Sequence, residues 1–239
     1  MLFSFLYELA IACAFVLNSP RMLYQLIRHK KYRTNLFARF GFGFPTITPK
    51  KDGPVIWIHA VSVGEIHAIA GLAKQLKEEI NNLTLVISST TETGHAEAKK
   101  TLAWAADAFV YLPFDFWLCV KKVLSRCTPD IVILSEGDLW YRFLHEVKKK
   151  GAITLITNGK MSKRSAEKMA RFSYFGKKLV SLIDHFCLQS ELYKQRFILT
   201  GVPASKISIT GNSKADALPL PLEGSAIDEL KQKLGVKTN

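Results

Sequence analysis

The chain has 239 residues, of which 48% are hydrophobic and 22% are charged, and its formal net charge at pH 7 is +13. This length is enough for a sizeable core in one large or two small domains. The basic charge favours an anionic partner, such as nucleic acid, an acidic membrane surface or a phosphorylated substrate. The four cysteines are far apart and lack the spacing of metal ligands, so we expect reduced thiols in a cytosolic compartment and no zinc site.

The N-terminal segment reads MLFSFLYELAIACAFVL, with Glu8 as its one charge, and basic residues follow between Arg21 and Arg33. This stretch is short for a spanning helix, which needs about 20 apolar residues. A cleaved signal peptide carries its positive charge before the apolar stretch, whereas here the charge comes after it. The positive-inside rule then keeps the bulk of the chain in the cytoplasm. We expect residues 1–33 to form an uncleaved membrane anchor, spanning or half-buried, with a basic flank. The alternative is a core helix of the domain.

Apolar segments alternate with helical patterns from Ile56 to Asn212. Strands are predicted at residues 55–58, 83–88, 109–112, 131–134, 153–157, 185–188 and 207–210. Helices are predicted at residues 65–79, 93–105, 116–125, 140–150, 163–182 and 191–199. Most strands are continuously apolar, which is typical of strands buried on both faces. The pattern predicts an α/β fold with a doubly wound, Rossmann-like parallel sheet, in which ligands bind beyond the carboxyl ends of the strands.

The stretch WIHAVSVGE, residues 57–65, places Glu65 just past the first strand and in the first turn of the next helix. Functional groups gather at this edge of a parallel sheet. Gly64 allows close approach of the backbone to a ligand, and Ser62 can form a hydrogen bond or cap the helix. We expect an ionised Glu65 carboxylate that projects into an open crevice. The alternative is electrostatic, because the helix dipole favours an acid in the first turn.

The stretch ILSEGDLW, residues 133–140, places two more acids at the end of the fourth predicted strand. Glu136 and Asp138 could bind sugar hydroxyls or share acid–base work. The alternative is a solvated turn in which Asp138 caps a helix that starts near Leu139.

The stretch TNGKMSKRSA, residues 157–166, follows the fifth predicted strand and brings positive charge to the amino end of a helix, where anions bind well. A phosphate site is expected there, and a cationic surface loop is the alternative. Its candidate residues are Asn158, Lys160, Ser162, Lys163 and Arg164, and Ser162 can also cap the next helix.

The stretch ITGNSKAD, residues 209–216, follows the last predicted strand, and Asn212 and Lys214 could face the cleft unless the segment is an ordinary β-turn. His59 and His95 are better explained as structural residues than as catalytic ones. Residues 218–239 contain a proline-rich linker and a new amphipathic helix, which we interpret as the start of a second unit.

Several motifs are missing from the sequence. It has no G-x-x-x-x-G-K-[ST] phosphate loop, no G-x-G-x-x-G after the first strand and no G-x-S-x-G elbow. Nucleotide hydrolysis, dinucleotide redox chemistry and serine esterase activity therefore lose support. A single carboxylate at the sheet edge, without a metal, suits deprotonation of an alcohol.

Seven stretches, taken in order, resemble one family, the 3-deoxy-D-manno-octulosonic acid (Kdo) transferases of Gram-negative lipopolysaccharide synthesis. They are KYRTNLFARFGF (31–42), WIHAVSVGE (57–65), SSTTETG (88–94), YLPFD (111–115), PDIVILSEGDLW (129–140), SKRSA (162–166) and ITGNSKAD (209–216). Each stretch alone is weak, but seven in the family's order are specific, and the resemblance covers nearly all of residues 1–216.

The resemblance implies a two-domain glycosyltransferase B fold. The amino-terminal domain, residues 34–217 here, would bind the lipid A precursor (lipid IVA), and a carboxyl-terminal domain would bind CMP-Kdo. Glu65 would act as general base on a primary hydroxyl of the glucosamine disaccharide, with inversion and without a metal or cofactor, and Glu136 would be a second important acid. The protein would lie at the cytoplasmic face of the bacterial inner membrane. A 239-residue chain without the donor domain would bind acceptor but not turn over.

Two stretches depart from the family's pattern. The family usually reads E-T-E-L-W-P-N where residues 136–142 here are EGDLWYR, and N-A-R-L-S where residues 158–162 are NGKMS. The first change shortens one acid and loses a proline. The second replaces a forked guanidinium with the point charge of a lysine. Both changes are expected to alter the geometry of the acceptor site.

Two other function classes fit parts of the sequence. A membrane-associated module could bind an anionic glycolipid without chemistry, and such a module should tolerate Glu65→Gln. The interpretation as a nucleic-acid binder rests on charge alone, because the sequence lacks the aromatic and basic surface motifs of such binders. We therefore expect no nucleic-acid partner.

Overall fold

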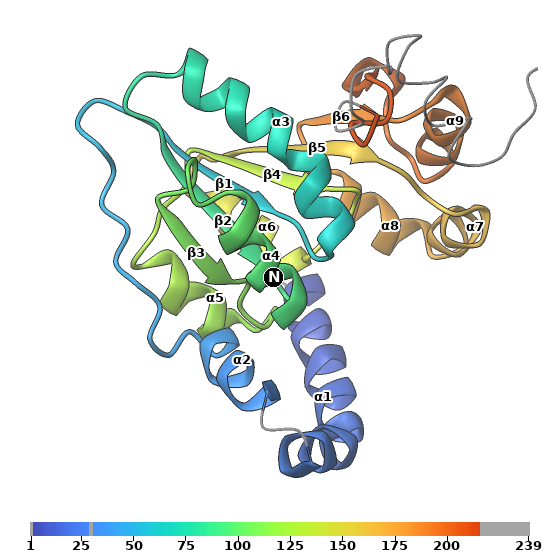
Figure 1. Ribbon diagram of the computed structural model, residues 1–239. Coiled ribbons are helices and arrows are strands. Elements are labelled where there is room, and N and C mark those ends of the chain that lie inside the picture. The colour runs from blue at the N-terminus through green and yellow to red at the C-terminus, as the bar shows by residue number, and fades with distance from the viewer. Residues whose placement is uncertain (1, 29–30, 216–239) are drawn as a thin grey trace, which may run out of the picture.

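A computed structural model of the chain describes residues 2–28 and 31–215 (Figure 1). Asp216 and the linker and second unit predicted at 218–239 lie outside these residues. The chain forms one seven-stranded sheet with the order β3-β2-β1-β4-β5-β6-β7, and every neighbouring pair of strands is parallel. The predicted doubly wound parallel sheet is confirmed.

All seven predicted strands are confirmed, with ends within two residues of those expected. They are β1 (Val55–His59), β2 (Thr84–Ser89), β3 (Ala108–Tyr111), β4 (Ile131–Ser135), β5 (Ile153–Gly159), β6 (His185–Leu188) and β7 (Ile207–Ile209). The helices are α1 (Leu2–Arg28), α2 (Lys31–Arg39), α3 (Val63–Glu79), α4 (Glu92–Thr101), α5 (Trp117–Leu124), α6 (Tyr141–Lys149), α7 (Lys163–Arg171), α8 (Ser173–Val180) and α9 (Glu191–Leu199), with a short 3₁₀ turn at Ala204–Lys206.

The central strands are continuously apolar because helices cover both faces of the sheet (Figure 1). Neighbouring side chains on a strand point to opposite faces. Ile56 and Ile58 of β1 therefore belong to the core that contains Ile69 of α3. Trp57 belongs to the opposite core, where its ring lies 5.2 Å from that of Phe143 of α6. Full burial of a large apolar side chain contributes about 1.5–3 kcal/mol to stability. These side chains therefore hold β1, the strand that ends at the candidate site, in place.

The prediction of one helix over residues 163–182 is wrong. The chain breaks at Phe172, whose φ of −95° and ψ of 52° are not helical, and α8 starts as a separate helix at Ser173. A Cβ atom added to Gly176 of α8 would lie 2.8 Å from the carbonyl oxygen of Met169, so the two helices meet where glycine alone fits. Helix α4 is also shorter than predicted and ends at Thr101.

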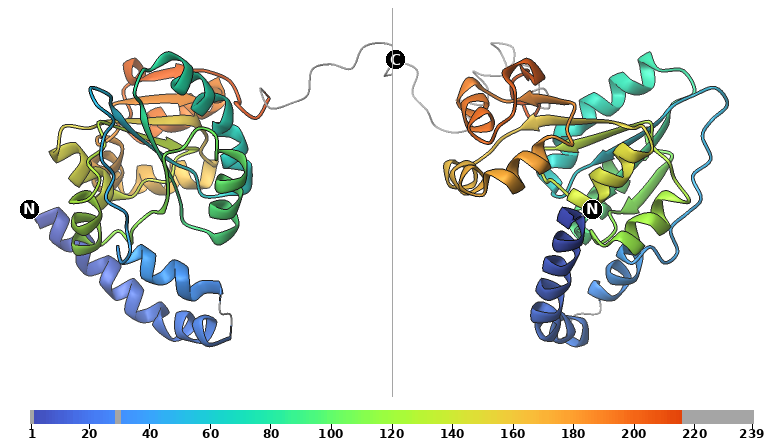
Figure 2. Two further views of the ribbon diagram at one scale, coloured as in Figure 1. Left: turned by 60° about the vertical axis from the view of Figure 1, so that its left-hand side comes forward. Right: turned by 180° about the vertical axis from the view of Figure 1, so that it is seen from behind.

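Helix α1 projects from the sheet domain, with α2 beside it (Figure 2). Its segment Leu2–Arg21 has 20 residues and a mean hydropathy of 1.7, which is long and apolar enough by length and composition to cross a membrane. Within the described part of the chain none of this segment's apolar window is buried, so the alternative of a core helix is wrong. An exposed apolar helix is compatible with membrane association.

The sheet reverses its winding between β1 and β4. From β1 the chain runs through α3 to β2, and from β4 it runs through α6 to β5 in the opposite direction along the sheet. The carboxyl ends of two such strands border the crevice where open α/β sheets bind ligands. Glu65 follows β1 and Glu136 follows β4, so both candidate acids lie at this switch point.

Candidate active site

Glu65 is held within the loop that joins β1 to α3. Ser62 is the N-cap of α3, and its hydroxyl oxygen accepts a hydrogen bond from the Glu65 backbone N–H at 3.3 Å. The Ser62 hydroxyl in turn donates to Glu65 Oε1 at 2.8 Å, and the Val61 backbone N–H donates to Oε2 at 3.0 Å. This reciprocal arrangement resembles a capping box, which satisfies the free donors at a helix start.

The expectation that Glu65 projects into an open crevice is wrong for this structure. The residue is 8% exposed, and both of its carboxylate oxygens accept hydrogen bonds from its own loop. The electrostatic alternative, an acid in the first turn of a helix, describes the observed geometry. Ser62, by contrast, is exposed, so one of the two residues that donate to the carboxylate lies at the surface.

The loop at residues 61–65 is supported from the end of β2. The Thr91 hydroxyl donates to the Val61 carbonyl at 2.7 Å, and Thr91 is also the N-cap of α4. A Cβ atom on Gly94 would lie 2.4 Å from that same carbonyl oxygen, so glycine is required by the close approach. This role could not be predicted from the sequence, because Val61 lies 30 residues away from Thr91.

Glu136 pairs with two lysines that come from different loops. Its Oε2 lies 2.6 Å from Lys160 Nζ, and its Oε1 lies 2.8 Å from Lys214 Nζ. Although burial alone would raise the pKa of the Glu136 carboxyl, the hydrogen bonds and charges of the two lysines outweigh it and hold the pKa below the usual value. Glu136 therefore stays ionised at neutral pH.

Glu136 also has an unusual backbone conformation. Its φ is +63°, in the left-handed region, and the next residue, Gly137, has a φ of +132°. A non-glycine residue in this region costs on the order of 1 kcal/mol or more, and such positions concentrate at functional sites.

Gly64 allows the ammonium of Lys214 to reach the β1–α3 loop. A Cβ atom on Gly64 would lie 3.4 Å from Lys214 Nζ, while that nitrogen is bonded to Glu136. The candidates Gly64, Glu136, Lys160 and Lys214 are therefore brought together, although they come from four junctions far apart in the sequence.

Asp138 is exposed beside this cluster. Partial desolvation, together with the negative charges of Glu65 and Glu136, raises the pKa of its carboxyl group. The alternative role of Asp138 as the cap of the next helix is wrong, because α6 begins at Tyr141 and its N-cap is Trp140. Asp138 instead occupies the middle of the loop between β4 and α6.

Asn158 and Asn212 shape the loop that carries Lys214. Asn158 is 2% exposed and adopts a φ of +53°, and its Oδ1 accepts a hydrogen bond from the Ser213 N–H at 3.2 Å. Asn212 Oδ1 accepts from the Lys214 N–H at 3.1 Å, which makes a local turn. Both interpretations of this stretch therefore hold in part, since it is a turn and its lysine faces the cluster.

Ser162 is the N-cap of α7, as predicted, and accepts a hydrogen bond from the Ser165 N–H at 3.1 Å. Lys163 has a side chain that is 81% exposed, and Arg164 is exposed as well. Among the residues that the structure describes, these two cations do not contact the Glu136 cluster. The cationic surface loop describes their position.

A cavity of about 660 Å³ opens beside Glu136, Asp138, Lys160 and Ser162. Arg196 of α9 lines the same cavity, and its Nη1 donates to the Met161 carbonyl at 2.8 Å. Sequence reasoning missed Arg196, because α9 lies two strands further along the chain and carries no local motif. The cavity combines carboxylates, cations and hydroxyls, which suits a sugar with an anionic group.

The two histidines singled out in the sequence are structural. His59 is 1% exposed, its Nδ1 lies 2.9 Å from Ser88 Oγ, and burial lowers its pKa to about 3. His95 stacks on Tyr111 with ring centroids 4.2 Å apart. The structural interpretation agrees with both positions.

No group of three or more His, Cys, Asp or Glu side chains that could hold a metal ion occurs within residues 2–28 and 31–215. All four cysteines lie in these ranges and are free thiols.

Comparisons with solved structures define the fold class. The chain superposes on a putative UDP-N-acetylglucosamine 2-epimerase from Listeria monocytogenes with a TM-score of 0.53 and 12% identity, covering 74% of this chain and 51% of that one. A second UDP-N-acetylglucosamine 2-epimerase gives a TM-score of 0.52 at 13% identity, covering 75% and 53%. At such low identity the likeness shows the fold alone, which is one half of a glycosyltransferase B-like architecture.

Sequence comparisons define the family. The profile described as "3-Deoxy-D-manno-octulosonic-acid transferase (kdotransferase)" matches residues 34–217. The 3-deoxy-D-manno-octulosonic acid transferase of Chlamydia pneumoniae is 35% identical over 213 residues, covering 89% of this chain and 48% of the relative. That of Chlamydophila psittaci is 36% identical, covering 98% and 53%. The chain belongs to the 3-deoxy-D-manno-octulosonic acid transferase family and spans about half the length of these curated relatives.

Proposed function

We propose that this chain supplies the acceptor-binding half of an inverting glycosyltransferase that moves Kdo from CMP-Kdo to the lipid A precursor lipid IVA. Its domain would comprise residues 34–217, and residues 218–239 would lead into the donor domain. Membership of the family supports the reaction. The observation that carries the site is the meeting of Glu136, Lys160 and Lys214 beside Gly64, at the switch point of the sheet.

Glu65 is the proposed general base. It would take the proton of a primary hydroxyl of the glucosamine disaccharide, the alkoxide oxygen would attack the anomeric carbon of Kdo, and CMP would leave with inversion. In the structure the Ser62 hydroxyl occupies Glu65 Oε1. The proposal therefore requires this exposed hydroxyl to rotate away when the acceptor hydroxyl arrives, while the Val61 N–H keeps Oε2 in place.

The other candidates would bind substrate. Glu136 and Asp138 would accept hydrogen bonds from sugar hydroxyls, and Lys160 and Lys214 would orient Glu136 or meet an acceptor phosphate. The cavity beside them, which Arg196 also lines, could hold the phosphorylated end of the disaccharide.

The remaining charges suit a membrane surface. Lys163 and Arg164 point outward from α7 and could meet lipid headgroups. The net charge of +13 suits a bis-phosphorylated glycolipid at an anionic surface. Helix α1 would anchor the protein at the cytoplasmic face of the inner membrane.

Replacement of the base tests the proposal. In the full-length protein, assayed with lipid IVA and CMP-Kdo, Glu65→Gln should lower kcat by about 10²–10⁴-fold, the usual contribution of a general base. Glutamine keeps the size of the side chain and can still accept from the Val61 N–H, so the thermal midpoint should change little. Glu78→Gln is the matched control, because Glu78 lies on the exposed side of the same helix. Equal turnover of Glu65→Gln and wild type would remove the proposed base.

A second candidate function is a module that binds an anionic glycolipid without chemistry. It is favoured by one observation, that both Glu65 oxygens are already satisfied within their own loop. In that case Glu65→Gln should bind lipid IVA as tightly as wild type, and the full-length wild-type protein should transfer no Kdo.

A further inference from the structure

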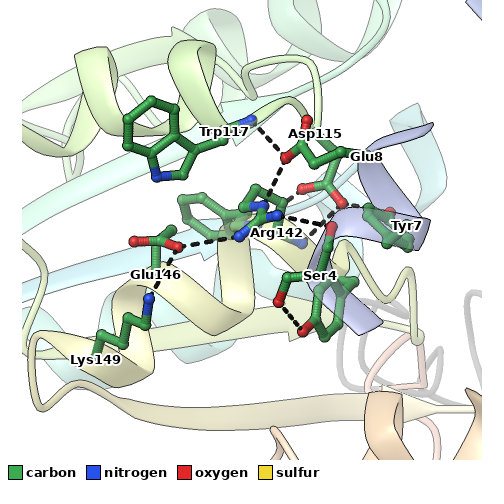
Figure 3. A network of polar contacts seen from close by, with 10 residues as sticks. Ser4, Tyr7, Glu8, Asp115, Trp117, Arg142, Glu146 and Lys149 are labelled. Atoms are coloured by element: carbon green, nitrogen blue, oxygen red, sulfur yellow. Dashed lines mark hydrogen bonds and ion pairs between the residues drawn. The ribbon is translucent and has the colours of Figure 1, made fainter. Parts of the chain in front are cut away.

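Helices α5 and α6 begin without a cap of their own. Their N-cap residues, Phe116 and Trp140, make no side-chain cap bond among the described residues. The first backbone N–H groups of a helix nevertheless need acceptors. Here acids from other elements supply them (Figure 3). Glu8 Oε1 of α1 accepts from the first N–H of α5, that of Trp117, at 2.9 Å.

Asp115 does the same for α6. Its Oδ2 accepts from the Arg142 N–H at 2.9 Å, and its Oδ1 accepts from the Phe143 N–H at 2.8 Å. The Tyr7 hydroxyl of α1 donates to Asp115 Oδ2 as well. Asp115 is 4% exposed, so a buried carboxylate receives one donor from α1 and two from α6. Helix α1 is therefore bonded to the amino ends of two helices.

The side chain of Arg142 makes α6 depend on α1. It is 7% exposed, and its guanidinium donates to Glu8 Oε1 at 2.7 Å, to the Ser4 carbonyl at 3.1 Å and to Glu146 Oε1 at 3.3 Å. A buried charge is costly without partners. Two of these three acceptors belong to α1 (Figure 3).

Aromatic packing strengthens the same contact between α1 and the start of α6. The rings of Phe3 and Tyr7 each lie 4.8 Å from the ring of Tyr141, centroid to centroid, and the hydroxyls of Ser4 and Tyr141 are 2.9 Å apart.

The contact between α1 and the start of α6 directly adjoins the candidate site. The loop of residues 136–140 begins at Glu136, whose N–H donates to the Thr157 carbonyl at 2.9 Å, and it ends where α6 starts. Asp138 lies between these two points. Since the first point is fixed by the sheet, we expect a shift at the start of α6 to move Asp138.

We propose that Tyr7 and Glu8 are positioning residues. The set Ser4, Tyr7, Glu8, Asp115 and Arg142, here termed the α1 latch, fixes the start of α6 and thereby the position of Asp138 in the acceptor site. Helix α1 then orients the site as well as anchoring the protein. The effect on acceptor rests on the proposed function, but the effect on the loop does not.

Amide hydrogen exchange tests the latch without any substrate. In the full-length protein in detergent, Glu8→Gln and the milder Tyr7→Phe should speed exchange at Trp117, Arg142 and Phe143, and with them at Asp138, by about tenfold or more, because the caps are weakened. Leu17→Ala is the control, since Leu17 is 80% exposed on the same helix and should leave these amides unchanged.

Kinetics test the coupling to the acceptor. Glu8→Gln should raise the KM for lipid IVA by about tenfold, as expected for a small misplacement of a binding group, and leave the KM for CMP-Kdo unchanged. Binding to liposomes should equal that of wild type, which separates positioning from anchoring. The double variant Glu8→Gln, Arg142→Gln should be less impaired than the sum of the single variants, because the two residues share one contact.

Four outcomes test the latch, its effect on the site and the proposed function separately. Unchanged exchange in both Glu8→Gln and Tyr7→Phe would overturn the latch. Faster exchange at the helix starts with an unchanged Asp138 amide and an unchanged acceptor KM would overturn its effect on the site. If Glu8→Gln does not fold, Tyr7→Phe decides alone. Absence of Kdo transfer by the wild-type protein would count against the proposed function, and the exchange at Asp138 would still decide the latch.

Discussion

Carboxylates accept hydrogen bonds from the first N–H groups of helices in two regions, the carboxyl edge of the sheet and the α1 latch. They do so in different ways. Glu65 caps its own helix from within its first turn. Glu8 and Asp115 cap helices that lie 109 and 27 residues away, respectively. At the edge, the lysines that pair with Glu136 have side chains 43% and 40% exposed, whereas Arg142 beneath α1 is 7% exposed. Exposed partners can be exchanged for a ligand, while buried partners hold the fold.

The largest expected effect comes from breaking the buried pair. Arg142→Ala removes a buried cation and leaves Glu8, whose side chain is 27% exposed, without its partner. Because Glu8 is partly hydrated, the loss of stability should be about 3 kcal/mol, the lower end of the cost of breaking a buried ion pair. Chemical denaturation in detergent measures the change. Lys149→Ala is the control, because Lys149 is 59% exposed and contacts Glu146 from the surface. A loss below about 1 kcal/mol would place this pair with the exposed ones and remove the contrast between the two regions.

A smaller effect is expected from crowding the loop at the sheet edge. Gly94→Ala places a Cβ atom where the Val61 carbonyl oxygen would be 2.4 Å away. The backbone must shift, at a cost of about 1–3 kcal/mol, which is typical of overpacking. Because that carbonyl belongs to the loop that carries Glu65, transfer activity should fall as well. Gly71→Ala in α3 is the matched control, since a Cβ atom there meets nothing within 4 Å. Normal stability and activity of Gly94→Ala would show that the loop adapts.

The smallest effect is expected from Glu136, and it depends on pH. The folded pKa of Glu136 is lowered, so its ion pairs stabilise the protein above the ordinary carboxylate pKa of 4.5, and this contribution is lost as the pH falls through the lower folded value. Because the lysines are partly exposed, the contribution should be below about 1 kcal/mol. Urea unfolding of wild type and Glu136→Gln between about pH 3 and 6 measures it. A pH slope that Glu136→Gln leaves unchanged would contradict the pairing.

The starts of α3 and α7 could be predicted from the sequence, because Ser62 and Ser162 cap within three residues of themselves. The helix over 163–182 could not be divided in advance, since the break at Phe172 depends on the close packing of Gly176 against Met169. Arg196 could not be predicted as a site residue either, because it lines the cavity from α9, an element that no sequence pattern links to Glu136.

The sequence by itself determined the seven strands, their parallel arrangement and the placement of Glu65 and Glu136 at strand ends, because apolar runs and helix caps are local patterns. Only the tertiary structure decided that Glu65 turns back into its own loop, that Lys160 and Lys214 converge on Glu136, and that α1 holds the start of α6. These contacts join residues far apart in the chain, and burial and charge pairing between them arise only when the sheet and its helices pack.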